Sequence, residues 1–175
     1  YMSPAKEVGR LASHWLKTPA ERPLWWDEYM GALPEWGMSH DPDIIRKITR
    51  SNLCPRSSAG CRAACLHTAG HGGFSPSVPI GRARKTVLWL AYRQQFWALL
   101  RADVDRLYRA AQRRGLRAQV RINGTTDVRW EQYAAFRRIA ADYPQVDFYD
   151  YTKYPIKARQ GLPENYRLTF SLSEG

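Results

Sequence analysis

The hydrophobic and polar positions after Pro79 follow a helical period. Apolar residues recur every three or four positions between Leu88 and Ala111, which predicts a long amphipathic helix, broken near Tyr92. The apolar stripe consists of Leu88, Tyr92, Phe96, Leu100, Val104, Leu107 and Ala111. Gly115 is expected to end this helix as its C′ residue, because glycine readily adopts the left-handed conformation found there.

The pattern beyond Gly115 alternates between strands and a helix. Residues 118–122 and 146–151 favour strands, residues 130–143 favour a helix, and residues 166–172 favour a last strand. This order predicts parallel strand pairing with right-handed crossovers. We therefore expect an α/β fold, either a partial β/α barrel or a small open, mostly parallel sheet flanked by helices.

The N-terminal part of the chain holds four of the seven tryptophans. Residues 4–17 predict a short helix, and residues 41–50 predict another that is capped by its first residue. Residues 24–38 contain further aromatic side chains, which we expect to pack on the core rather than to form a base-stacking platform. We thus predict a Trp-rich helical segment over residues 1–51, packed on an α/β core over residues 52–175 within a single domain.

The charge of the chain favours an anionic partner. Lys and Arg outnumber Asp and Glu by 27 to 16, and residues 81–175 carry 18 basic and 9 acidic side chains. A basic surface attracts polyanions, so we expect nucleic acid or a phosphorylated small molecule as the partner. Ordinary solubilising charge is the alternative explanation.

The sequence contains neither a long apolar run nor an N-terminal secretory signal. We therefore expect a cytoplasmic protein without a membrane partner. The chain begins with Tyr1 rather than Met and stops shortly after an apolar run, so we also expect it to be a shortened form of a longer protein.

Three cysteines within twelve positions carry the strongest chemical signal. An odd count this close together suits a metal site better than a disulfide framework. Cys61 and Cys65 stand four residues apart and can share one face of a helical turn, while the six residues before Cys61 let Cys54 fold back onto them. Thiolates select zinc, iron–sulfur clusters or copper(I), and Arg56 and Arg62 favour the thiolate forms.

The fourth ligand distinguishes two kinds of metal site. His67 or His71 would complete a closed, structural zinc site. An open fourth position would instead give a three-cysteine [4Fe–4S] cluster suited to catalysis. The spacing differs from the Cys-x3-Cys-x2-Cys of radical S-adenosylmethionine enzymes, which weakens that assignment. Three reduced cysteines without a metal are the remaining alternative.

Polar residues follow each predicted strand at its carboxyl end, where parallel sheets bind ligands. For proton transfer or substrate anchoring we predict Asp127, Asp150 and Lys153. The predicted substrate-binding residues are Arg121, Asn123, Thr125, Thr152, Ser171 and Glu174. Each cluster alone is typical of an ordinary turn, but three on successive strands predict one shared site.

Arg121 lies within a predicted strand, where a charged side chain needs a ligand or a counter-ion. If it has a counter-ion, we expect Asp127 or Asp150.

Several segments between residues 52 and 175 form a wider pattern. They are Cys54-Pro55, Gly60-Cys61, Ala64-Cys65-Leu66, Thr68-Ala69-Gly70, Arg84-Lys85-Thr86, Val120-Arg121-Ile122-Asn123-Gly124-Thr125-Thr126-Asp127, Phe148-Tyr149-Asp150-Tyr151-Thr152-Lys153 and Leu168-Thr169-Phe170-Ser171-Leu172-Ser173-Glu174. In order and spacing they resemble a family of bacteriophage proteins described as gene product 88-like. The resemblance implies relatives that extend beyond this chain at both ends, and an insertion over residues 10–50. It also implies Asn and Arg in place of His67 and His71, which favours a three-cysteine site with an open position.

Together these features predict a phage-encoded protein that binds a metal or an iron–sulfur cluster and acts on nucleic acid or nucleotides, as an enzyme that modifies them. One alternative is a basic nucleic-acid-binding module, such as a DNA-binding protein, that has structural zinc and no activity. Another is a phage inhibitor that docks on a host protein through its basic face.

Overall fold

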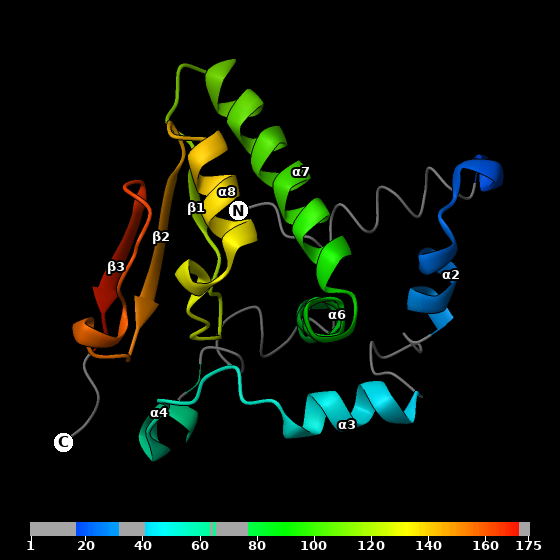
Figure 1. Cartoon of the computed structure of the whole chain (residues 1–175), viewed down its shortest axis with the longest axis horizontal. Helices are drawn as coiled ribbons and strands as arrows, with labels where there is room; N and C mark the ends of the chain where they lie inside the picture. Colours follow the sequence, from blue (N-terminus) through cyan, green and yellow to red (C-terminus); the bar gives the residue numbers. More distant parts are fainter. Residues whose placement is uncertain (1–16, 32–40, 64, 66–76, 172–175) are drawn as a thin grey trace. The chain divides into compact units, whose positions relative to one another are not determined.

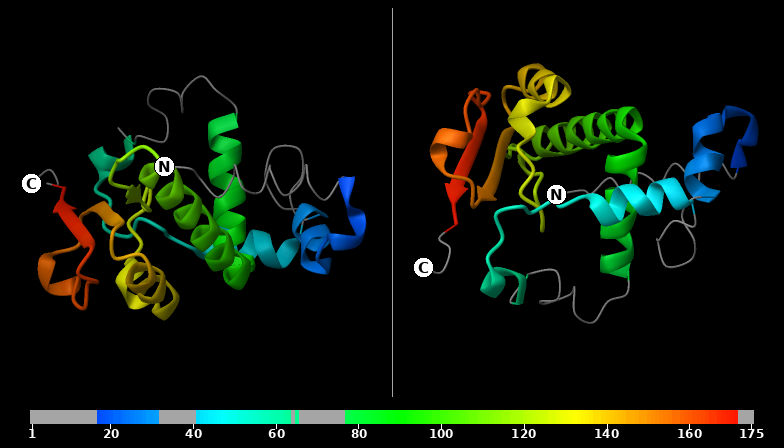
Figure 2. Two further views of the ribbon diagram at one scale, coloured as in Figure 1. Left: turned by 90° about the horizontal axis from the view of Figure 1, so that it is seen from above. Right: turned by 60° about the horizontal axis from the view of Figure 1, so that its bottom comes forward.

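The computed structural model describes residues 17–31, 41–63, 65 and 77–171. Of the helix predicted over residues 4–17, only Lys17 belongs to this part of the chain. The described residues form two compact units, both drawn in Figures 1 and 2. We refer to Asn52–Gly70 with Val104–Gly175 as the sheet unit, and to Met2–Ser51 with His71–Asp103 as the helical unit.

The described residues of the helical unit are mostly helical. Its elements are η1 (Pro19–Glu21), α2 (Leu24–Gly31), α3 (Pro42–Arg50), α6 (Ser77–Ala91) and the first part of α7 (Arg93–Gln112). The Asp41 side chain accepts a hydrogen bond from the Asp43 amide at 2.8 Å, so the predicted N-cap of α3 is confirmed. Tyr29 is fully buried, and its ring lies 5.3 Å from that of Tyr92.

The long amphipathic stripe folds as two helices rather than one. α6 ends at Ala91 and α7 begins at Arg93, so the predicted break near Tyr92 is confirmed. The two helix axes meet at a sharp bend, which Figures 1 and 2 both show. At the other end of α7, Gly115 has φ of 62°, and the Leu116 amide donates to the Ala111 carbonyl. This is a Schellman motif, with glycine at C′ as predicted.

The sheet unit contains the α/β part of the fold. Its elements are α4 (Ala59–Ala63), the end of α7, β1 (Gln119–Arg121), η2 (Trp130–Gln132), α8 (Ala134–Asp142), β2 (Asp147–Thr152), η3 (Ile156–Ala158) and β3 (Tyr166–Phe170). The three strands pair in parallel in the order β1-β2-β3. The prediction of an α/β fold with a small open parallel sheet is confirmed. The single helix predicted over residues 130–143 is divided at Tyr133 into η2 and α8.

One face of the sheet is packed and the other is exposed. The register places Val120, Phe148 and Tyr166 side by side, and all three are buried. The ring of Phe136 on α8 lies 5.4 Å from Phe148 and 5.0 Å from Tyr166, so α8 covers this inner face. The register aligns the intervening residues Arg121, Tyr149 and Arg167 on the opposite, outer face.

The first residue of the sheet unit after Tyr1 is Asn52, where we predicted that the α/β core begins. The helical unit also takes in α6 and the start of α7, which the sequence pattern had assigned to the α/β core. Within the part of the chain that the structure describes, no helix is long and apolar enough to cross a membrane.

Candidate functional site

The carboxyl ends of β1 and β2 are joined by the side chain of Asp150. This carboxylate is fully buried and accepts hydrogen bonds from the Asn123 amide at 2.7 Å and from Asn123 Nδ2 at 3.1 Å. A third donor, the Tyr166 hydroxyl, lies 2.8 Å from Asp150 Oδ2. Burial raises the pKa of Asp150 to about 7, although these donors and two arginines favour the ionised form.

Asn123 shapes the loop that follows β1. Its Nδ2 donates to the Val128 carbonyl at 2.9 Å, and its Oδ1 accepts from the Val128 amide at 3.1 Å. The Thr126 hydroxyl donates to the same oxygen at 2.7 Å. With every polar atom of its amide engaged, this buried side chain fixes the path of the loop toward Asp127.

Arg159 is the centre of the buried polar cluster. Its guanidinium donates to both Glu131 carboxylate oxygens, at 2.7 and 2.9 Å, in a forked pair. It also donates to Asp127 at 3.4 Å, to Thr152 at 2.8 Å and to the Tyr166 hydroxyl at 3.2 Å. The side chains of Arg159 and Glu131 are each only 1% exposed. Although burial opposes the charge, the hydrogen bonds to Glu131 hold the pKa of Arg159 above its ordinary value.

Asp127 connects this buried cluster to the cysteine segment. Its backbone amide donates to the Leu53 carbonyl at 2.7 Å, directly before Cys54. Its carboxylate accepts from the Lys153 amide at 2.8 Å and from Arg159. One aspartate therefore fixes three segments at the carboxyl edge of the sheet.

The three cysteines lie in one electrostatic neighbourhood beside Asp127. Each is free and half-buried. Burial raises the pKa of the Cys54 thiol, and the negative charges of Asp127, Cys61 and Cys65 raise it further, while Lys153 opposes them. The Cys54 amide donates to Asn52 Oδ1 at 2.9 Å, so the chain turns at this position.

The chemistry of these donors fits a thiophilic metal, but their positions do not form a finished site. Among residues 17–31, 41–63, 65 and 77–171, no three His, Cys, Asp or Glu side chains are arranged to hold a metal ion. His67 and His71 lie outside the described residues. Zinc–sulfur bonds are about 2.3 Å long, so metal binding would have to draw the three thiolates closer together.

Comparison with known proteins identifies the family. The profile described as gene product 88 matches residues 11–175. The chain belongs to the gene product 88 family. This membership confirms the resemblance seen in the sequence motifs and supports a bacteriophage origin. A search of curated proteins found no match, and neither did a search of solved structures.

In this gene product 88 protein the predicted site residues occupy different environments. Lys153 and Thr125 are partly exposed, whereas Thr152 is buried and accepts a hydrogen bond from Arg159. The Ser171 amide donates to the Thr152 carbonyl at 2.8 Å, which places Ser171 at the same edge. Glu174 lies outside the described residues.

Arg121 takes its partners from the backbone at the end of β1. Its Nε donates to the Asn123 carbonyl at 2.8 Å, and its Nη2 donates to the Gly124 carbonyl at 3.2 Å. Its charge also lowers the pKa of Asp150, which we had named as a counter-ion. Arg121 is therefore held in place at the rim of the site by carbonyl groups.

The sequence pattern did not identify Glu131, Arg159 and Tyr166 as members of the site. Glu131 lies in η2, Arg159 follows η3, and Tyr166 begins β3. Nothing in their local spacing marks them, because they come together only through the tertiary fold. A charged residue just past a short turn is also typical of an exposed loop.

Replacing Arg159 should unfold the site. Arg159→Met leaves Glu131 and Asp127 buried without their partner, so we expect it to lower the free energy of unfolding by about 3–5 kcal/mol. Arg117→Met is the matched control, because Arg117 pairs with Asp147 while its side chain is 66% exposed. That control should cost less than about 1 kcal/mol. Urea unfolding measures both values, and equal losses would show that Arg159 does not organise the site.

The buried Asp150 predicts a pH dependence of stability. Its pKa is raised to about 7 in the folded chain, so between about pH 4 and pH 7 the folded state binds more protons than the unfolded state. The contribution of Asp150 to stability should therefore decline as the pH rises through this range. Asp150→Asn should flatten that part of the profile of urea midpoint against pH. An unchanged slope in the variant would contradict the raised pKa.

Proposed function

We propose that this protein binds a metal ion or an iron–sulfur cluster through Cys54, Cys61 and Cys65, and that it acts on nucleic acid or nucleotides. The observation that carries the proposal is the hydrogen bond from the Asp127 amide to the Leu53 carbonyl, which fixes the segment of three free, half-buried cysteines at the carboxyl edge of the sheet. All three cysteines are reduced and half-buried, as free metal ligands are. Because the pKa of the Cys54 thiol is raised, metal binding would have to displace its proton, as it does at other thiolate sites.

The backbone around the cysteines supports this proposal. The Leu53 carbonyl accepts from the Asp127 amide, which anchors the segment to the sheet unit immediately before Cys54. The Arg56 guanidinium lies over the Tyr154 ring, 5.7 Å from its centroid. The Cys61 amide, within α4, donates a hydrogen bond at 3.0 Å to Oγ of Ser58, the residue that precedes this helix. Such outer contacts orient metal ligands and influence their affinity.

The environments of Lys153, Asp127 and Asp150 suggest which of them would contact a substrate and which would position the site. Lys153 is partly exposed and next to Cys54, so it is suited to contact a phosphate or carboxylate of a substrate. Asp127 and Asp150 are buried and engaged by internal donors, which suits them to positioning the site. Proton transfer by either carboxylate stays a prediction.

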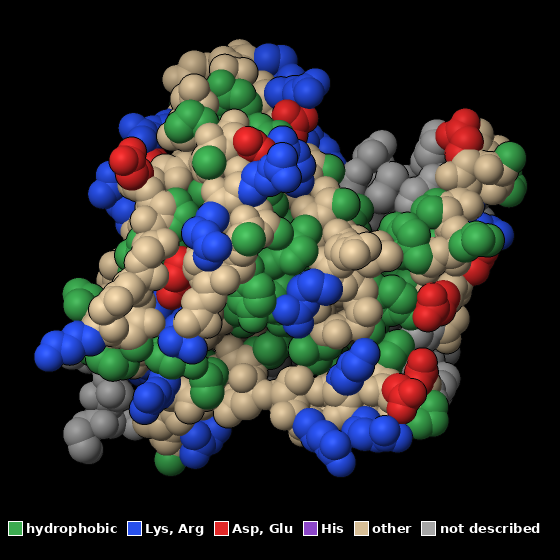
Figure 3. Space-filling view, viewed as in Figure 1, with side chains coloured by type: hydrophobic (Ala, Val, Ile, Leu, Met, Phe, Trp, Pro, Cys, Tyr) green, Lys and Arg blue, Asp and Glu red, His purple; other side chains and the backbone are tan. Residues whose placement is uncertain are grey.

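The basic surface supports the choice of substrate class. Figure 3 shows one face of the molecule, where Lys and Arg side chains over the sheet unit are more frequent than Asp and Glu side chains. Exposed arginines of the sheet unit on or beside α7 and α8 include Arg113, Arg114, Arg137 and Arg138. A surface of this kind binds phosphates with a strong dependence on salt.

The same arginines favour a second candidate function, a nucleic-acid-binding module in which the cysteines hold structural zinc. The two candidates differ in the metal and in its effect on folding. Structural zinc stabilises the folded state directly, so a chelator would unfold the chain. A catalytic cluster would keep an open position, and its loss would remove activity first.

Metal analysis of anaerobically purified protein tests the proposal. We expect bound iron with broad visible absorption, or bound zinc for the second candidate. Cys54→Ser, Cys61→Ser and Cys65→Ser should each lower the metal content at least several-fold, because each removes a ligand. Ser57→Ala, in the same segment, should leave the metal content unchanged.

The absence of metal from the wild-type chain, both after anaerobic purification and after reconstitution with iron or zinc, would contradict the proposal. Metal content that persists in all three serine variants would assign the metal to other ligands. Far-UV circular dichroism of each variant separates ligand loss from unfolding.

A further inference from the structure

The outer face of the sheet carries two exposed aromatic rings. Tyr149 and Tyr151 are 36% and 44% exposed, and they stand two residues apart on the central strand β2. Because alternate residues of a strand point to the same side, both lie on the outer face. The buried neighbours Phe148 and Asp150 point to the inner side.

An exposed face is unusual for a parallel sheet. Parallel strands are normally covered on both sides, so their faces are apolar and hidden. Here the outer positions carry tyrosine, arginine and threonine, and Arg167 and Thr169 on β3 are exposed as well. Exposed apolar area surrounded by charged side chains indicates an interaction surface.

Arginines flank both tyrosines. The register pairs Arg121 and Arg167 with Tyr149, one on each neighbouring strand. The Arg121 guanidinium lies over the Tyr151 ring, 4.7 Å from its centroid, and its bonds to the carbonyls of Asn123 and Gly124 hold it there. On this face, aromatic rings on which bases can stack therefore lie next to positively charged guanidinium groups.

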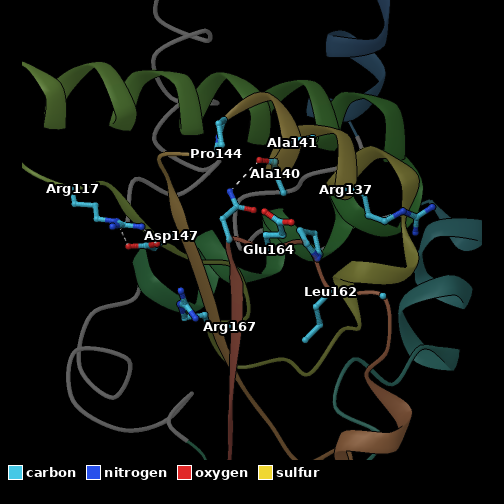
Figure 4. A pocket seen from close by; sticks show the side chains of 12 residues that line it. Arg117, Arg137, Ala140, Ala141, Pro144, Asp147, Leu162, Glu164 and Arg167 are labelled. Carbon is cyan, nitrogen blue, oxygen red and sulfur yellow. Dashed lines mark hydrogen bonds and ion pairs between the residues drawn. The ribbon is translucent and has the colours of Figure 1, made fainter.

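A groove of about 610 Å³ lies at the amino edge of the same sheet. Three arginines from different segments line it, namely Arg117, Arg137 and Arg167. Figure 4 shows Arg117 and Arg137 on opposite sides of the view. Asp147 pairs with Arg117. Pro144 and Leu162 add apolar surface. Arg167 belongs to both the groove and the outer face.

Asn165, which also lines this groove, fixes the backbone around it. Its Nδ2 lies 3.0 Å from each of three carbonyl oxygens, those of Ala140, Tyr143 and Val146. These carbonyls belong to the end of α8 and to the turn before β2. The side chains that line the groove therefore stand on a fixed frame, which lowers the entropy cost of binding.

We propose that the outer face of the sheet binds single-stranded nucleic acid, with bases stacked on Tyr149 and Tyr151 and phosphates bound by Arg121 and Arg167. We call this row of tyrosines and arginines the single-strand track. The groove extends it toward Arg117 and Arg137. Stacked aromatic rings between cations are the recurring means of holding single strands, because every base has a flat face and every nucleotide has a phosphate. The inference rests on the nucleic-acid part of the proposed function and specifies its substrate as single-stranded.

Other anionic occupants fit this surface less well. In a duplex the bases stack on one another, so the two rings would have no partner. An acidic peptide would pair with the arginines but gains little from flat, exposed rings. The charge and the stacking groups together therefore select an unpaired strand.

Fluorescence anisotropy with a labelled oligothymidine and the full chain tests the inference. Tyr149→Ala should weaken binding roughly tenfold, since one stacked base contributes about this much, whereas Tyr149→Phe should bind almost as well as the wild type. Arg167→Gln should reduce the slope of log affinity against log salt by about 0.7. Arg46→Gln is the matched control, because Arg46 is exposed on α3 and belongs neither to the outer face of the sheet nor to the groove lining.

Three results would overturn the inference, and each has a different meaning. Unchanged binding by Tyr149→Ala and Arg167→Gln would leave nucleic-acid binding intact and assign it to another surface. Tighter binding to a duplex of the same length would exclude a single-strand track. No binding of either nucleic acid by the wild type would also remove the nucleic-acid part of the proposed function, while leaving metal binding untouched.

Discussion

The guanidinium of Arg159, held between the carboxylates of Glu131 and Asp127, is the interaction on which the sheet unit depends. A buried positive charge is tolerated only when it is paired and hydrogen-bonded, and here five donated bonds satisfy that requirement. These bonds reach η2, the loop after β1, the end of β2 and the start of β3. The polar cluster thus aligns segments that three short strands alone would hold weakly.

This constraint extends to the cysteines through Asp127. The carboxylate of Asp127 is fixed by Arg159 and by the Lys153 amide, and its own amide holds Leu53. Cys54 consequently stands at the carboxyl edge of the sheet, where parallel sheets bind ligands. The same edge carries Arg121, which joins it to the tyrosines of the outer face. Arg121 would therefore connect the proposed metal site at the carboxyl edge to the proposed nucleic-acid surface on the outer face.

The sequence predicted the fold better than the site. Periodicity gave the break at Tyr92, the cap at Asp41 and the glycine at 115, because these features depend on neighbours in the chain. It also placed Asn123, Asp127 and Asp150 together, since strand ends in a parallel sheet converge. It could not reveal Arg159, whose partners lie up to 32 residues away in sequence. Nor could it show which face of the sheet stays exposed, because that depends on which helices pack against it.

The most direct test of the account is a cobalt(II) titration of the anaerobic chain, followed through the thiolate-to-cobalt absorption bands. If Asp127 holds the cysteines in place, Asp127→Asn should weaken cobalt binding by about 10- to 100-fold, as loss of a supporting contact does at other metal sites. Asp147→Asn, which disrupts only the ion pair with the largely exposed Arg117, should leave the affinity unchanged. Equal affinity in the two variants, or no thiolate bands in the wild type, would contradict the central role of Asp127.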